Sequence, residues 1–312
     1  MKLFYIIAVL ILFQSCSFDN KSGIWTDEKN IQTREEKLFK DFELITTLEE
    51  SFDKEIQLKG SYKFNLPALK VNNKWNDIYY NNNKSINFKY NEKNNLIFKS
   101  KKISKHKTSN FLLYDNNNIV SSDSKGNIIV YSLINKNIIS KFNFYKKKHR
   151  NIEKSLNIII DNKIIYISDN IGYLYAYDYF ENKLLWAKNY KIPFRSNLKI
   201  KNNKLIGANQ NNTLFFFDQN DGSIIQSFPT EDNTIKNKFI NNLSTNRDRV
   251  FFLNTYGSIY SINPKTMRLE WFKNLNQTRD INPGNLFFGN QIINDDENLI
   301  INSNNHTYVI DI

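Results

Sequence analysis

A short segment recurs along this chain with a nearly constant internal spacing. Its clearest copy runs from Ser168 to Asp178 and is followed by Trp186. The turn residues that correspond in the five copies are Gly126, Gly172, Asn212, Gly257 and Asn305. Glycine and asparagine adopt a positive φ most readily, so each copy is expected to turn sharply at this position. Such a repeat restricts the fold to an array of similar units.

The distances between the turn residues show how large each unit is. Successive turn residues are 46, 40, 45 and 48 residues apart, whereas positions inside each copy keep their spacing. In the second copy, β-branched and aromatic runs of strand length occupy 156–160, 164–168, 173–177 and 184–190. Four strands per unit, without helical periodicity, predict an all-β fold in which four-stranded blades pack around an axis. We therefore expect a β-propeller with four full repeats and a partial fifth.

Short polar residues stand at two further positions of each copy. They lie three residues before the turn residue and six after it: Asp123, Asp169, Asn209, Asn254 and Asn302, then Ser132, Asp178, Asp218, Asn263 and Asp311. Such side chains bond to their own backbone and open turns, so we interpret the repeated carboxylates as turn residues and not as calcium ligands. The three histidines and the single cysteine show no metal-ligand spacing, and no metal site is expected.

The segment 169–178, followed by 182–186, resembles the PQQ-like propeller repeat. In that family a tryptophan fourteen residues after the turn residue lies between neighbouring blades, and Trp186 and Trp271 match it, whereas Ser140 and Gln226 do not. Dehydrogenases, sensors and scaffolds share this repeat, so it implies the fold more than the chemistry. The enzyme alternative is a PQQ-dependent dehydrogenase. Its vicinal cysteines are missing from a chain with one cysteine, so we expect neither catalysis nor a cofactor.

The N-terminus has the pattern of an export signal. The apolar run from Leu3 to Phe13 is too short to span a bilayer and fits the core of a signal peptide at 1–15. The segment that ends in Cys16 resembles a bacterial lipobox, although Phe13 and Gln14 depart from its usual residues. Cys16 is therefore predicted to be the lipid attachment site, and Ser17 implies sorting to the periplasmic face of the outer membrane. An ordinary secretory signal and an uncleaved membrane anchor remain alternatives.

The rest of the chain divides by composition and by order. Residues 16–60 are predicted to form a lipid-anchored tether, partly disordered, 61–95 lead into the propeller, and 96–312 contain the repeats. The order of Pro67, Trp75 and a strand at 96–100 resembles the start of the propeller in the BamB family, lipoproteins of the outer-membrane β-barrel assembly machinery. That strand either completes the last blade and closes a ring of five, or the chain is the truncated front part of a longer propeller. The eight blades of the family favour the second account.

The same resemblance implies a non-catalytic scaffold that binds the POTRA domain of the barrel subunit. Ile192, Phe194 and Arg195, in the loop 191–196, match the hydrophobic and arginine contacts of the family and are predicted to bind this partner. In the alternative, Ile192 and Phe194 are buried between blades and Arg195 pairs locally. A propeller that binds another envelope partner is a further alternative.

The chain has a net charge of +12. In a cytoplasmic protein this excess would suggest nucleic acid, but we do not expect an exported chain to bind it. The basic runs are interpreted as solvated loops, and attraction to anionic lipid head groups is the alternative. The expected membrane attachment is through the lipid anchor.

Overall fold

Five antiparallel sheets make up the described part of the chain. The computed structural model describes residues 74–79, 96, 98–145, 149–232, 240–276, 286, 287, 289, 291–294, 297–303 and 306–312. All of them lie in one compact unit, Leu66–Ile312. These residues include no helix that is long and apolar enough to cross a membrane.

Each sheet is a meander in which strands pair in the order of the sequence. The first sheet contains β1 (Lys74–Trp75), β2 (Leu113–Asp115), β3 (Asn118–Ser122), β4 (Asn127–Ser132) and β5 (Asn137–Asn143). The second contains β6 (Leu156–Asp161), β7 (Ile164–Asp169), β8 (Tyr173–Asp178) and β9 (Lys183–Asn189). The third contains β10 (Lys199–Lys201), β11 (Lys204–Ala208), β12 (Thr213–Asp218) and β13 (Ile224–Pro229). The fourth contains β14 (Asn242–Thr245), β15 (Val250–Leu253), β16 (Ser258–Asn263) and β17 (Arg268–Asn274). The fifth contains β18 (Ile293–Asn294), β19 (Asn298–Asn302) and β20 (Thr307–Asp311).

The prediction of an all-β propeller is confirmed. The four strands predicted for the second copy agree with β6 to β9 to within one residue at each end. The pairing of the last two strands shifts register at the same repeat position in four sheets, after Val130, Ala176, Phe216 and Ser261. Such a bulge increases the local twist, and its recurrence shows that the units repeat in geometry as well as in sequence.

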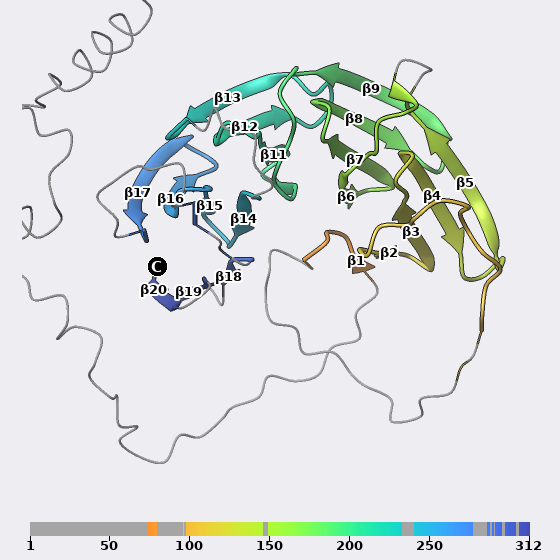
Figure 1. Cartoon of the computed structure of the whole chain (residues 1–312), viewed down its shortest axis with the longest axis horizontal. Coiled ribbons are helices and arrows are strands. Elements are labelled where there is room, and N and C mark those ends of the chain that lie inside the picture. The colour runs from red at the N-terminus through yellow and green to blue at the C-terminus, as the bar shows by residue number, and fades with distance from the viewer. Residues whose placement is uncertain are drawn as a thin grey trace, which may run out of the picture. The chain divides into compact units, whose positions relative to one another are not determined.

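The hydrophobic core lies between neighbouring sheets. Figure 1 shows the sheets following one another along an arc, with β5, β9, β13 and β17 on its outer side. Each buried cluster joins two consecutive sheets: Val130 packs with Ile167 in the first cluster, and Phe216 with Phe252 in the third. A fully buried side chain of this size contributes about 1.5–3 kcal/mol, so the stability of the blades depends on their neighbours.

The prediction of a strand at 96–100 is wrong. Leu96 is 81% exposed, and the described residues of this segment belong to no strand. The ring of Phe98 instead stacks on Tyr131 of β4, with the centroids 6.3 Å apart, and Nζ of Lys136 lies over the Phe98 ring, 5.5 Å from its centroid. This segment therefore contacts the first sheet through an aromatic ring and not through backbone pairing. Within the described residues, no strand pairing joins the fifth sheet to the first.

Candidate partner-binding loops and the central polar network

The loops that join consecutive sheets lie at the same end of the strands as the repeated turns. Because the strands of a meander alternate in direction, the turn between the second and third strands and the loop after the fourth strand share one end. Backbone hydrogen bonds hold the two together: the Tyr190 amide donates to the carbonyl of Gly172, and the Gln210 amide to that of Pro193, both at 2.8 Å. We call this end the loop face.

The repeated carboxylates and amides form the turns of this face. Oδ1 of Asp169 accepts hydrogen bonds from the amides of Ile171, Gly172 and Tyr173 at 2.7–2.9 Å. Asp123, Asn209 and Asn254 accept equivalent bonds in the other blades. The interpretation of these residues as turn residues is confirmed. Among the described residues, no group of three or more His, Cys, Asp or Glu is arranged to hold a metal ion.

The loop 191–196 presents only part of the trio expected from the sequence. Phe194 is 2% exposed and packs edge-on against Tyr190 and Phe217, with the ring centroids 5.8 and 6.1 Å apart. Ile192 and Arg195 are half-buried, and Nε of Arg195 has no hydrogen-bond partner among the described residues. Burial between the second and third sheets, the alternative considered above, therefore holds for Phe194. Its ring supports the loop from inside and is not an exposed contact.

Trp186 lies between the second and third sheets. Its Nε1 donates to the carbonyl of Gln219, in the turn before β13, at 3.2 Å. A Cβ on Gly222 would lie 2.5 Å from the indole ring, so that glycine leaves room for the tryptophan. Trp271 packs in the cluster between the fourth and fifth sheets, where its ring centroid is 6.1 Å from that of Phe251.

The two positions without a tryptophan use other contacts. The hydroxyl of Ser140 is 2.7 Å from the hydroxyl of Tyr177 in the next sheet, and Phe142 stacks on the same ring at 4.2 Å. Gln226 is exposed, and the third and fourth sheets meet instead through buried side chains that include Phe216 and Phe252. The docking of these blades therefore does not require a tryptophan at the fourteenth position.

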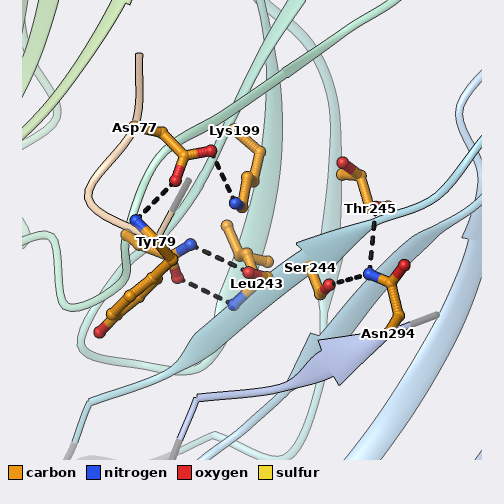
Figure 2. A network of polar contacts seen from close by, with 8 residues as sticks. Asp77, Tyr79, Lys199, Leu243, Ser244, Thr245 and Asn294 are labelled. Carbon is orange, nitrogen blue, oxygen red and sulfur yellow. Dashed lines mark hydrogen bonds and ion pairs between the residues drawn. The ribbon is translucent and has the colours of Figure 1, made fainter. Parts of the chain in front are cut away.

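A polar network joins the innermost strands, and sequence reasoning missed it. Figure 2 shows Nζ of Lys199, in β10, against the carboxylate of Asp77, and the two atoms are 2.8 Å apart. The other oxygen of Asp77 accepts the Tyr79 amide at 2.7 Å. Both members of the ion pair are buried, so the segment after β1 is fixed against the third sheet.

Asparagine side chains extend this network between sheets. The amide group of Asn197 both donates to and accepts from the backbone of Leu243 in β14, at 2.9 Å each. Asn294 of β18 donates to the hydroxyl of Ser244 and to the carbonyl of Thr245 (Figure 2). A side-chain amide thus takes the place of a backbone ladder where adjacent innermost strands do not pair. The signal for this network was a break in the repeat, because Lys199 occupies a register position that holds Ile159 in the second sheet.

Glu231 follows β13 in the next loop of this face and binds the fourth sheet. Its carboxylate accepts hydrogen bonds from Asn254, Ser258 and Tyr260, each at 2.6 Å. Burial alone would raise the pKa of Glu231, but these hydrogen bonds outweigh it and hold the pKa below its ordinary value of 4.5. The ionised carboxylate therefore stabilises the contact between the third and fourth sheets.

The substitution Glu231→Gln is expected to lower the free energy of unfolding at pH 7 and to have a smaller effect at about pH 3. A carboxyl group with a lowered pKa in the folded state contributes its stability above pH 4.5 and loses it as the pH falls. Urea unfolding at both pH values, with Asp232→Asn as the exposed control, measures the difference. An equal effect of Glu231→Gln at both pH values would contradict this role.

Cys16 and the signal peptide predicted at 1–15 lie outside the described residues, so the structure says nothing of the lipid attachment.

Comparison with protein-family models shows which family this chain belongs to. A model of the family described as outer membrane protein assembly factor BamB matches residues 143–312, more than half of the chain. The chain belongs to this family. No curated protein matches this BamB-family chain.

Comparison with solved structures gives neighbours of low sequence identity. The crystal structure of BamB from Moraxella catarrhalis has a TM-score of 0.52 and 16% identity, over 62% of this chain and 58% of that one. The C-terminal WD40 domain of Sif2 has a TM-score of 0.47 and 16% identity, over 63% of this chain and 52% of that one. This BamB-family chain therefore spans less than two thirds of the Moraxella protein. At such identity the likeness to that BamB shows the propeller fold alone.

Proposed function

We propose that this chain is a non-catalytic scaffold lipoprotein of outer-membrane protein assembly, anchored to the periplasmic face of the outer membrane through Cys16. The observation that carries the proposal is membership of the BamB family over residues 143–312. The lipobox-like segment before Cys16 supports the location. The repeat accounts for the carboxylates that would otherwise suggest a catalytic or metal site.

We further propose that the loop 191–196 contacts the POTRA region of the barrel subunit. Arg195 carries this part of the proposal, because its side chain is partly exposed and forms no ion pair within the described residues. Its backbone is held on both sides: the amide donates to Ala208 at 3.0 Å and the carbonyl accepts from Asn241 at 2.8 Å. A guanidinium on a fixed backbone is well suited to bind a carboxylate of a partner. Ile192 adds an apolar contact beside it.

The substitution Arg195→Glu is expected to weaken recovery of the barrel subunit in a pull-down by about ten-fold or more, the size of effect of a hot-spot residue. Lys191→Glu is the matched control, because Lys191 is exposed on the same loop and undergoes the same change of charge. We expect Lys191→Glu to retain most of the binding.

Three outcomes separate the alternatives. Equal recovery of wild type, Arg195→Glu and Lys191→Glu would reject the loop as the contact but leave the scaffold function. No recovery of the barrel subunit by wild type would reject the function and favour another envelope partner. Phe194→Ala is not a binding test, because loss of a ring that is 2% exposed removes support from the core.

A further inference from the structure

Three backbone segments meet on the loop face beside the first and second sheets. The Ser124 amide donates to the carbonyl of Lys107 at 2.8 Å, and the Lys154 amide donates to the carbonyl of Ser124 at 2.9 Å. The hydroxyl of Ser104 donates to Asp123 at 2.6 Å. The segments 104–109, 123–127 and 149–155 therefore form one continuous surface, although the first precedes β2, the second connects β3 to β4 and the third follows β5.

This surface is strongly basic. Lys105, Lys107, Lys125 and Arg150 are all exposed, and none of them has an ion pair within the described residues. Asp123 and Asp169 lie beside them, but both carboxylates are buried and accept hydrogen bonds from the turns. Their charges are directed into the fold. Glu153 is the exposed acidic residue of these three segments, so the four exposed cations leave the surface with a net positive charge.

Lys154 fixes the shape of the loop 149–155 from inside. Its side chain is buried, and Nζ donates to the carbonyls of His149 and Ile152. The amine lies 4.7 Å from the ring centroid of Tyr145, whose hydroxyl donates to Asp169 at 2.6 Å. Burial lowers the pKa of Lys154, and the nearby charge of Lys125 lowers it further. This internal support leaves Arg150 and Ile152, which is 45% exposed, pointing to solvent.

We propose that this surface, defined by Lys105, Lys107, Lys125, Arg150 and Ile152, binds the head groups of an anionic phospholipid membrane. Cations on long side chains, spread over three segments, match a mobile array of lipid phosphates and do not require a fixed partner geometry. The exposed Ile152 among them supplies an apolar group that can enter the interface, as in peripheral membrane proteins. A specific protein contact would instead require a central cluster of large buried side chains, and the surface has one isoleucine.

The test measures binding of the full chain to vesicles of phosphatidylcholine alone and of phosphatidylcholine with about a third phosphatidylglycerol. The apolar N-terminal run is present in both measurements, so the difference in binding between the two vesicles measures the effect of lipid charge. We expect the triple variant Lys105→Glu, Lys125→Glu, Arg150→Glu to reduce binding to the anionic vesicles by about ten-fold or more. Raising the salt to about 0.5 M is expected to weaken the wild type in the same way.

The matched control is the triple variant Lys183→Glu, Lys265→Glu, Arg268→Glu. It changes the net charge equally at exposed positions near the opposite ends of the strands, and we expect it to bind anionic vesicles almost as wild type does. The proposal is overturned if wild type does not prefer the anionic vesicles, or if both triple variants lose binding equally. A loop-face variant that binds vesicles as wild type does but fails to bind an acidic protein would also overturn it. The test does not involve the barrel subunit, so its failure is distinct from failure of the proposed function.

Discussion

Asp77→Ala is expected to lower the free energy of unfolding by about 3–5 kcal/mol, the usual effect of removing one member of a buried ion pair. The side chain of Lys199 is 0% exposed and lies 2.8 Å from the carboxylate of Asp77. Burial lowers the pKa of Lys199, and the negative charge of Asp77 opposes that effect. Without this carboxylate the buried ammonium loses its compensating charge, and the segment after β1 loses its attachment to the third sheet. Urea unfolding at pH 7 measures the change.

Two further variants separate this ion pair from general sensitivity to substitution. The double variant Asp77→Leu, Lys199→Met is expected to regain much of the lost stability, because apolar residues of similar volume often replace a buried pair without loss. Lys188→Met is expected to change stability by less than about 1 kcal/mol, since its pair with Asp221 is solvent-exposed. If Asp77→Ala and Lys188→Met have equal effects, the buried pair does not hold this segment.

Trp186→Ala is expected to lower the free energy of unfolding by about 2–4 kcal/mol. This lies towards the lower part of the range for truncation of a large core side chain, because Trp186 is half-buried. The substitution leaves a cavity between the second and third sheets and removes the hydrogen bond to Gln219. Gly222→Ala is expected to act in the same direction, because its Cβ would lie 2.5 Å from the indole and its φ is +71°. Thermal or urea unfolding measures both variants.

Phe180→Ala provides the control for Trp186. Phe180 is also aromatic and belongs to the same blade, but it is 65% exposed and contacts Lys163 in solvent. We expect its removal to change stability by less than about 1 kcal/mol. Equal losses for Trp186→Ala and Phe180→Ala would show that the tryptophan does not dock the blades.

The repeat made most of the fold predictable. Hydrogen bonds between a short polar side chain and the next few amides are local, so Asp169 and Gly172 determine their turn wherever the blade lies. The strands between such turns followed from β-branched and aromatic runs, and β6 to β9 appear where the sequence placed them. The segment 96–100 was mistaken for a strand because Leu96 and Phe98 resemble an outer strand in composition, whereas stacking on Tyr131 decided its place.

The functional residues were harder to predict, because their exposure depends on neighbouring blades. Nothing in the loop 191–196 distinguishes an exposed Phe194 from a buried one. The packing of the third sheet, with Phe217 and Leu205, buries it. The basic surface on the loop face also depends on how distant segments pack together. Lys105, Lys125 and Arg150 are separated in the sequence and become neighbours through backbone hydrogen bonds around Ser124.

The sequence by itself determined the repeat, its turns and the family, because each depends on residues a few positions apart. The tertiary structure decided which side chains are buried and which charges meet, because blade packing brings together residues far apart in the chain. Asp77 and Lys199 show the difference most directly. Each is an ordinary charged residue in the sequence, and only the placement of β1 beside the innermost strands makes them a buried pair.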